Sequence, residues 1–537
     1  MVFNRKKNII QKLDKSWGKP KEETFNFELI GRYFCKRDNS SAFHVVSEQT
    51  INDIDFRDVF AFADRTTSLV GQQYLYSKLL TIEKSPSFDK QEILIDYFTH
   101  NKTRRLDAQY YLSKLSDVYT YDVADLFLEK FADPPKYLII IKLLSAVSFL
   151  TALLTVIFPQ IALLLVGLFS VNIFIHYANK KYTCRYANSI QRLSKLCSFT
   201  ENLLRFKLPS ISETAVRQSV KSIESLKSKM KVFELEARQV SDPFMGMAYL
   251  FSEYLKVQFL LEPILVFSVL RRLKERRGDI QTFFEYCGEI DSAISIASLR
   301  AGLPHYCKPL ISSEQSGLHA SGLYHPLVSN CVANDITTGP KSILLTGSNM
   351  SGKSTFIRAI SINTLFAQTI NTSFATEFRI PPLKLYSTIR ISDDVMSGKS
   401  YYFQEVLAVK NLLTASQTDS SCLFCLDEIF RGTNTIERIA IAKAVLSRIC
   451  LNGNIVIVST HDIELSGLLR GNYDLYHFRE DVEDGTVHFD FKLKRGFLKK
   501  HNAIRILQIN GYPQDLIQEA ISVSKSVADQ SKYYLSI

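Results

Sequence analysis

The hydrophobic positions of the chain follow three patterns. Residues 56–136 and about 178–320 carry the mixed apolar and polar spacing of packed helices. Between them, residues 138–157 and 161–175 are almost entirely apolar. From about residue 321 onward, short apolar runs alternate with longer amphipathic segments, which predicts parallel strands separated by helices. We therefore expect an all-α domain followed by an α/β domain.

A glycine-bounded loop lies between the apolar run 343–345 and a helix that begins near Thr355. Its residues are Gly347, Ser348, Asn349, Met350, Ser351, Gly352, Lys353 and Ser354. Without a Cβ, the two glycines let backbone N–H groups and the helix N-terminus surround a phosphate. Thr355, at the start of the helix, is expected to help bind the same phosphate. Lys353 adds a positive charge toward the β- and γ-phosphates, and Ser354 offers a hydroxyl to Mg²⁺. The pattern predicts a P-loop; the alternative is an ordinary glycine turn.

Two further apolar runs end in polar residues. Residues 422–426 form a fully apolar run followed by Asp427 and Glu428, the pattern of a buried parallel strand that ends at a ligand crevice. Asp427 is expected to hold Mg²⁺ and Glu428 to orient or deprotonate the attacking water. The run 455–459 is followed by His461, which we expect to sense the γ-phosphate. The alternatives are an acidic strand end that feeds a loop and a structural histidine.

These blocks resemble the ATPase core of the MutS-type mismatch-repair family. The resemblance covers residues 344–358, 426–435 and 459–461, together with Tyr324-His325-Pro326-Leu327 and Asn334-Asp335. Residues 391–400 are similar to the family segment that reaches the nucleotide of a partner subunit, which implies that Ser400 contacts the partner's γ-phosphate. The resemblance implies ATP and Mg²⁺ as cofactors, a homodimer that ATP closes and hydrolysis reopens, and DNA as a partner.

A weaker resemblance extends upstream. Residues 60–68 with Gly71 and Leu75 look like the first helices of the family's α-helical core, and residues 288–297 look like the helix that leads back to the ATPase. The 55 residues before this core leave no room for mismatch-reading and connector domains. We therefore expect duplex DNA to be bound without preference for a mismatch.

The apolar runs on either side of Pro159 predict a transmembrane helical hairpin at 137–177. At 1.5 Å per residue the first run spans a bilayer core and the second falls slightly short. Lysines at both ends favour a cytoplasmic position for the two flanking segments. The protein is therefore expected in the inner (cytoplasmic) membrane with its soluble domains in the cytoplasm; the alternative is a buried hairpin of a soluble helical core.

Composition adds two constraints. The nine cysteines are scattered, which favours reduced thiols. The Cys422-x-x-Cys425 pair falls inside a predicted strand, which favours packing over metal binding or redox chemistry. The net charge of +11 calls for an anionic neighbour. Basic clusters at 5–21, 271–277 and 492–500 are suited to binding DNA phosphates or anionic lipid. The alternative for each cluster is a helix face exposed to solvent.

The expected fold is an α/β P-loop NTPase domain of the ABC/MutS type, C-terminal to an all-α core or lever domain that carries the membrane hairpin. The expected boundaries are a basic segment at 1–55, the helical domain at 56–320, the ATPase at 321–515 and a closing helix at 516–537. The expected function is a MutS-like ATPase that opens and closes a dimer on DNA. The alternative is a membrane-anchored ATPase that acts on a protein or lipid partner without DNA. An ABC transporter is a weaker option, because the hairpin is too small for a conduit.

Overall fold

The computed structural model describes residues 2–129, 137–206, 208–209, 213–231, 243–348, 350–390, 401–418, 421–483, 486–496 and 503–534. The chain folds into two compact units whose segments interleave along the sequence. The first contains residues 1–39, 63–78 and 87–302, and the second contains residues 40–62, 79–86 and 303–537. Each unit is described separately.

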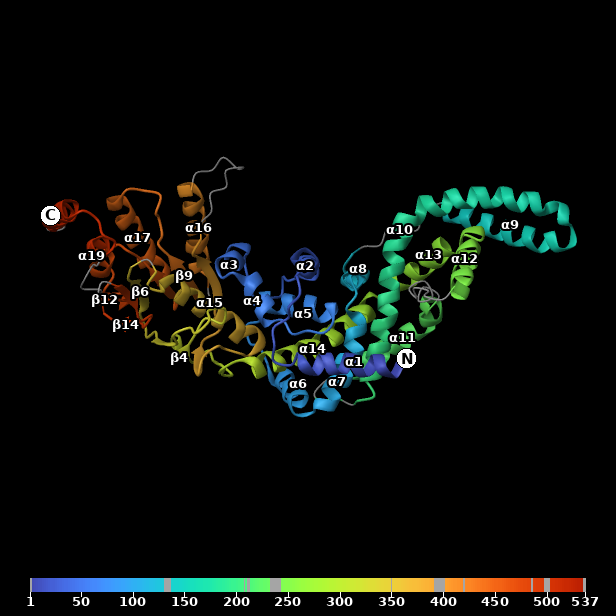
Figure 1. The fold of residues 1–537 in the computed structure, drawn as a ribbon, viewed down its shortest axis with the longest axis horizontal. Coiled ribbons are helices and arrows are strands. Elements are labelled where there is room, and N and C mark those ends of the chain that lie inside the picture. Colours follow the sequence, from blue (N-terminus) through green and yellow to red (C-terminus); the bar gives the residue numbers. More distant parts are fainter. Residues whose placement is uncertain are drawn as a thin grey trace. The chain divides into compact units, whose positions relative to one another are not determined.

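The first unit is helical, as the sequence predicts (Figure 1). Its main helices are α1 (Val2–Lys15), α2 (Phe27–Lys36), α5 (Leu69–Leu80), α6 (Asp89–His100), α7 (Lys102–Leu112), α8 (Asp125–Leu128), α9 (Leu138–Ile157), α10 (Ala162–Leu203), α11 (Glu213–Lys231), α12 (Pro243–Gln258), α13 (Leu261–Lys274) and α14 (Arg277–Gly302). Helix α14 is central, since it packs against α6, α8, α10 and α11. Its side chains from Phe283 to Leu299 are almost all buried, as expected of a core helix.

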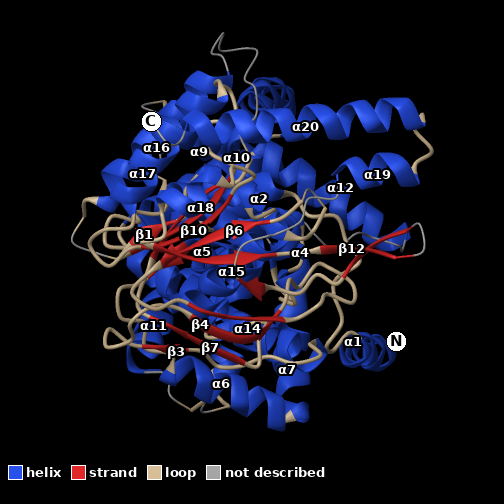
Figure 2. Cartoon of the chain, turned by 90° about the vertical axis from the view of Figure 1, so that its left-hand side faces the viewer, coloured by secondary structure: helices blue, strands red, loops and turns tan. Residues whose placement is uncertain are grey.

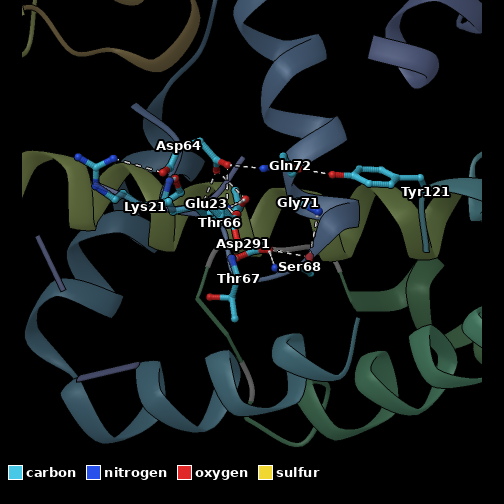
Figure 3. Close-up of polar contacts among 12 residues, drawn as sticks. Lys21, Glu23, Asp64, Thr66, Thr67, Ser68, Gly71, Gln72, Tyr121 and Asp291 are labelled. Atoms are coloured by element: carbon cyan, nitrogen blue, oxygen red, sulfur yellow. Dashed lines mark hydrogen bonds and ion pairs between the residues drawn. The ribbon is translucent and has the colours of Figure 1, made fainter. Parts of the chain in front are cut away.

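A buried carboxylate on α14 ties this helix to the start of α5 (Figure 3). Asp291 accepts hydrogen bonds from the backbone N–H groups of Thr67 and Ser68 at 2.9 and 2.7 Å, and from the Ser68 hydroxyl at 2.6 Å. These donors include N–H groups at the N-terminus of α5, which the helix itself cannot satisfy. Burial raises the pKa of Asp291 to about 6, while the hydrogen bonds from Ser68 and Thr67 act in the opposite direction. The two upstream segments that resemble the MutS core therefore meet at one carboxylate.

A second buried carboxylate organises the adjoining loop (Figure 3). Asp64 accepts hydrogen bonds from the Thr66 N–H at 2.8 Å, from the Gln72 amide at 2.7 Å and from the Lys21 ammonium at 2.8 Å. The Tyr121 hydroxyl donates to the Gln72 side chain at 2.5 Å. Because Lys21 and Tyr121 lie more than 40 residues from the Asp64–Gln72 segment that they bond to, this network holds together elements that are distant in sequence.

The two apolar runs form the predicted helical hairpin, α9 and α10, with a short 3₁₀ turn at Pro159–Ile161. Both helices are long and apolar enough to cross a membrane, with mean hydropathies of 2.2 and 2.1 over their apolar windows. Only 17% and 11% of those windows are buried. Large apolar side chains such as Ile139, Val156, Leu163 and Phe174 are instead exposed. The packing of this unit therefore leaves most of the hairpin's apolar surface uncovered.

The second unit is built around a six-stranded sheet with the order β14-β11-β6-β10-β9-β8 (Figure 2). The strands are β6 (Ser342–Thr346), β8 (Lys384–Thr388), β9 (Cys422–Asp427), β10 (Ile455–Ser459), β11 (Tyr473–His477) and β14 (Lys494–Arg495). Neighbours from β11 to β8 are parallel, and β14 pairs antiparallel with β11. The three strands that the sequence predicts, at 343–345, 422–426 and 455–459, are confirmed as β6, β9 and β10.

Helices cover both faces of this sheet, as expected for parallel strands. On one face, α16 (Tyr401–Ser416) and α17 (Thr435–Ile449) contribute Leu412 and Leu446 to a core with Phe424 and Val456. The helix α15 (Lys353–Ile370) packs against β8, β9 and β10 and is buried over most of its length. Cys422 belongs to the core with α16 and α17, and Cys425 is buried as well. Both cysteines lie in β9, so the strand predicted for this cysteine pair is confirmed.

Smaller elements complete the second unit. A four-stranded sheet has the order β3-β7-β4-β5, made of Leu310–Ile311, Glu377–Ile380, His319–Leu323 and Asn334–Thr337. Two-stranded pairs are β1 (His44–Val45) with β2 (Thr81–Ile82), and β12 (Glu480–Glu483) with β13 (Thr486–Phe489). The remaining helices are α3 (Glu48–Asp53), α4 (Phe56–Ala63), α18 (Glu464–Leu468), α19 (Ala503–Ile509) and α20 (Gln514–Tyr534).

The close approach of α5 to α14 predicts that Gly71 tolerates no side chain. A Cβ at this position would lie 2.2 Å from the Asp291 Oδ2 atom, which is buried and hydrogen-bonded. Gly71→Ala should therefore destabilise the protein by about 1–3 kcal/mol, although alanine favours helices. The matched control is Gly278→Ala on α14, where a Cβ meets nothing within 4 Å. The melting temperature in detergent should fall for Gly71→Ala and stay unchanged or rise for Gly278→Ala; equal melting temperatures would contradict this packing.

Candidate functional site

Three neighbouring parallel strands end at the same edge of the main sheet. β10 lies between β6 and β9, with Ser459 level with both Leu345 and Asp427. The glycine loop follows β6, Glu428 follows β9 and His461 follows β10 by one further residue. The carboxyl ends of parallel strands are where α/β proteins place their ligands. The predicted site residues therefore converge at one position.

The loop between β6 and α15 needs glycine at two points. Gly347 has φ of 150°, and a Cβ there would lie 2.9 Å from both the Phe478 carbonyl oxygen and the Ser351 hydroxyl. Gly352 has φ of 105° directly before α15. Met350, at φ of 74°, shows that the loop is tightly turned even without glycine. Within the loop the buried Ser351 hydroxyl donates to the Ser348 carbonyl at 2.8 Å.

The buried Lys353 side chain points back into this loop. Its ammonium donates to the carbonyl oxygens of Gly347 and Ser348, both at 2.8 Å, and lies 3.4 Å from Nε2 of His461. Burial lowers the pKa of Lys353 from its ordinary value, although Glu428 and Asp427 act in the opposite direction. A cation held this way at the first residue of a helix, next to free N–H groups, is suited to an anionic ligand.

The Asp427 carboxylate bridges two strands and the helix. It accepts a hydrogen bond from the Ser354 hydroxyl at 2.5 Å and another from the Ser459 hydroxyl. A carboxylate beside a hydroxyl, both reachable from a phosphate loop, is the oxygen-donor set that Mg²⁺ prefers. The pair Ser354 and Asp427 therefore fits the metal role expected from the sequence.

Glu428 lies between two basic side chains. Its Oε1 atom is 2.6 Å from His461 Nε2, and its Oε2 atom is 2.8 Å from Arg431 Nε. Burial alone would raise the pKa of Glu428, but the hydrogen bond and charge of His461, together with Arg431 and Lys353, lower it below its ordinary value. The backbone at Glu428 has a positive φ of 51°. A strained backbone conformation at a strand end is typical of a functional residue.

The sequence did not point to Glu405, which supports the loop that carries Glu428. Glu405 lies on α16, is fully buried, and accepts hydrogen bonds from the backbone N–H groups of Phe430 and of Arg431, the latter at 3.2 Å. Burial raises the pKa of Glu405, while the N–H groups of Arg431 and Phe430 act in the opposite direction. Phe430 also has a positive φ of 63°, so the carboxylate holds an otherwise unfavourable turn. A single acidic residue in an apolar helix was the available signal.

A cavity of about 360 Å³ extends from the glycine loop. One part is lined by Lys353, Ser354, Thr355 and Glu428, and another by apolar side chains that include Val332 and Phe491. A Cβ on Gly352 would lie 3.3 Å from the Phe491 ring. The cavity therefore has a polar region suited to phosphates and an apolar region suited to a flat, uncharged group.

Asn334 fixes the apolar wall of this cavity. Its side-chain amide donates to the Phe491 carbonyl at 2.9 Å and accepts from the Leu493 N–H at 2.8 Å. Phe491 has a positive φ of 50°, so this clamp holds the ring in a turn that the backbone disfavours. Asn334 belongs to the residues that carry the family resemblance, but the sequence alone gave it no role.

A buried aspartate holds the chain just before the predicted cross-dimer segment. Asp53, at the end of α3, accepts hydrogen bonds from the Ser387 hydroxyl at 2.6 Å and from the N–H groups of Ile389 and Arg390 at 3.1 and 2.8 Å. Burial raises the pKa of Asp53, and these hydrogen bonds act in the opposite direction. Asp53 therefore fixes the backbone at Ile389 and Arg390, directly before the segment 391–400.

The structure brings together most of the predicted site residues. Those at the cavity or in direct contact with it are Gly347, Ser348, Met350, Ser351, Gly352, Lys353, Ser354, Thr355, Asp427, Glu428 and His461. Asn349 and Ser400 lie outside the described residues, so their predicted roles stay predictions. The chemical roles assigned to the other residues are likewise proposals, which the geometry supports.

Comparison with known proteins shows what the C-terminal part of this chain is similar to. Residues 343–528 match the family model described as MutS domain V. The DNA mismatch repair protein MutS of Listeria welshimeri is 31% identical over 285 residues, which is 51% of this chain and 33% of the relative. The MutS proteins of Bacillus velezensis and Geobacillus sp. are 31% and 30% identical over 278 and 285 residues. The matched region is about a third of these relatives' length. Residues 343–528 are therefore similar to MutS domain V, and about half of the chain is similar to MutS proteins.

Proposed function

We propose that this protein binds ATP with Mg²⁺ and hydrolyses it in a P-loop site at the edge of the main sheet. The observation that carries the proposal is the convergence of Lys353, Ser354, Asp427 and Glu428 at one cavity. A lysine, a hydroxyl and two carboxylates are the groups that phosphoryl transfer to water requires. The apolar wall near Phe491 gives the base of the nucleotide a place in the same cavity.

Each residue has a distinct task in this scheme. The loop N–H groups from Ser351 to Thr355 and the Lys353 ammonium bind the phosphates. Ser354 and Asp427 would hold Mg²⁺, which would supply positive charge beside the phosphate oxygens. Glu428 orients a water molecule and accepts its proton, and a lowered pKa keeps this carboxylate ionised at neutral pH. His461, in contact with both Glu428 and Lys353, reports on the γ-phosphate.

We further propose that the chain works as a homodimer, with Ser400 reaching the nucleotide of the partner. ATP would close the dimer on duplex DNA through phosphate contacts, and hydrolysis would reopen it. The name of the similar proteins, DNA mismatch repair protein MutS, favours DNA as the partner.

A specific observation favours a second candidate function, at the membrane. The α9–α10 hairpin exposes most of its apolar surface, and exposed apolar patches of this size mark membrane or protein interfaces. We propose that the hairpin anchors the protein in the cytoplasmic membrane. The ATPase would then act either on DNA near the membrane or on a membrane partner without DNA.

Hydrolysis should depend on the Glu428 carboxylate. Glu428→Gln keeps the size of the side chain but removes the proton acceptor, so turnover should fall by about 10²-fold or more while ATP binding persists. The matched control is Glu314→Gln, an exposed position outside the cavity, which should behave as wild type. Steady-state ATPase rates and equilibrium binding of labelled ATP measure the two effects. Near-normal turnover in Glu428→Gln would refute the assignment.

Glu405 should affect turnover through the loop that it supports. Glu405→Ala leaves two N–H groups without their acceptor, at a cost of about 1–3 kcal/mol, so kcat should fall about tenfold or more. KM for ATP should change little, because Glu405 is not among the residues that line the nucleotide cavity. Glu405→Gln retains an acceptor oxygen and should restore most of kcat. Equal losses in the two variants would show that the hydrogen bonds to Phe430 and Arg431 are not what matters.

If DNA is the partner, phosphate contacts should dominate its binding. The logarithm of affinity should then fall with the logarithm of salt concentration by about 0.9 per contacted phosphate. Since phosphates are alike in paired and mismatched duplexes, the two should bind with similar affinity. Fluorescence anisotropy with both duplexes, in ATP and in ADP, measures this. A tenfold preference for the mismatch would contradict phosphate-only readout, and absence of binding at low salt would favour the membrane partner.

A further inference from the structure

The turn between α12 and α13 contacts the hairpin halfway along its length. The Asn172 side-chain amide on α10 donates to the Gln258 carbonyl at 2.7 Å and to the Ser148 hydroxyl on α9 at 2.9 Å. The Ser145 hydroxyl on α9 donates to the Phe259 carbonyl at 2.6 Å. Ser148 and Asn172 are completely buried. The turn is therefore fastened to both arms of the hairpin.

These hydrogen bonds satisfy backbone groups that a helix cannot satisfy itself. Gln258 ends α12, and Leu260 adopts a left-handed conformation with φ of 48° before α13 begins. Carbonyls at a helix end need a partner outside the helix, which on a soluble surface is often water. Non-helical backbone at membrane depth is tolerated only where protein groups replace that water. The hairpin supplies such groups at Gln258 and Phe259.

Apolar side chains are exposed on both helices that flank the turn. Leu250 and Phe251 on α12 are 68% and 63% exposed, and Leu261 on α13 is 39% exposed. The Tyr254 ring lies 5.2 Å from the Phe169 ring of the hairpin. The exposed apolar surface of the hairpin therefore continues onto α12 and the start of α13.

Each acidic side chain in this region lies near a lysine or an imidazole. Glu253 and Lys256 form an ion pair at 2.8 Å, and the buried Glu262 carboxylate lies 3.7 Å from His176 Nε2. Charged side chains that reach membrane depth are generally paired in this way.

Helix lengths place the turn near the middle of a bilayer. The exposed apolar surface of α9 runs from Ile139 to Ile157, roughly the 30 Å of a bilayer core. Ser148 is ten residues from the start of α9 at Leu138, or about 15 Å along the helix. On α13, Arg271 is ten residues from Leu261, which is again about 15 Å along the helix. Arg271 and Arg272 are exposed and make the last turns of α13 basic. The chain from the turn into α13 runs alongside α10 in the same direction. Gln258 contacts Asn172, and Glu262, four residues later, lies near His176, which is four residues after Asn172.

We propose that α12 and α13 form a second, re-entrant membrane element whose turn enters the same bilayer as the hairpin to about mid-depth. The proposal rests on the membrane attachment proposed above. The partner of this surface is a lipid bilayer with anionic headgroups. Its acyl chains cover Leu250, Phe251 and Leu261. Arg271 and Arg272 lie at the headgroups on the side of the bilayer where α9 begins. Basic residues at that level are attracted to anionic lipid.

Single-tryptophan variants of the full chain provide the test, because the sequence has one tryptophan, Trp17. In a Trp17→Phe background, Phe251→Trp and Leu261→Trp report on the proposed element, and Leu153→Trp, which is exposed on the distal half of α9, reports on the hairpin. Phe403→Trp, exposed on α16, is the reference in water. Each variant is reconstituted into vesicles of phosphatidylcholine and phosphatidylglycerol, with or without brominated acyl chains.

The proposal predicts a loss of emission with brominated lipid for Phe251→Trp and Leu261→Trp, comparable to that of Leu153→Trp, with a shift to shorter wavelength relative to Phe403→Trp. If only Leu153→Trp is quenched, α12 and α13 lie outside the bilayer and the re-entrant element is wrong while the hairpin anchor stands. If none of the three is quenched, the hairpin does not enter the bilayer and both proposals fail.

Discussion

The parallel register of β6, β10 and β9 brings the ends of these three strands, and the site residues that follow them, to one edge of the sheet. Because Ser459 on β10 is level with Leu345 on one side and Asp427 on the other, the residues after the three strands emerge at the same height. The glycine loop, the two carboxylates and His461 therefore meet without any long side chain having to cross the sheet. A slip of one residue in any of these strands would turn its side chains to the opposite face and separate Asp427 from Ser354.

Bringing these groups together has an electrostatic cost that the site offsets locally. A buried ammonium is disfavoured, yet Lys353 finds two carbonyl oxygens and two nearby carboxylates. Burial opposes the ionised form of Glu428, but His461, Arg431 and Lys353 overcome that effect. The charges are thus mutually stabilised within one cluster. The polyphosphate and metal ion proposed above would bring charges of both signs to the same groups. A site arranged this way can exchange internal partners for ligand contacts without exposing an uncompensated charge.

The sequence predicted those parts of the protein that depend on local pattern. Fully apolar runs identified β6, β9 and β10, and the glycine spacing located the loop, because backbone conformation there leaves few residue types possible. The paired apolar runs likewise predicted α9 and α10. Glu405, Asn334 and Phe491 could not be placed in the same way. Each acts through contacts with residues at least 25 positions away, so its role follows from tertiary packing and not from its neighbours in sequence. The role of residues 391–400 rests only on family resemblance, and it stays a prediction because the segment lies outside the described residues.

In both units, polar side chains form hydrogen bonds with backbone groups that are left unpaired at helix ends or in turns. These bonds explain why the buried polar residues are compatible with apolar surroundings. Asp291 receives the free N–H groups at the start of α5, Glu405 those of the loop at Phe430 and Arg431, and Asn172 donates to the last carbonyl of α12. In each case the backbone group has no partner within its own element and little access to water, so an unpaired state would cost about 1–3 kcal/mol. The side chain that removes this cost comes from a different element, and it can do so only when that element is correctly docked. Buried polar residues of this kind contribute little to net stability by themselves, but they penalise misdocked arrangements and so select a single one.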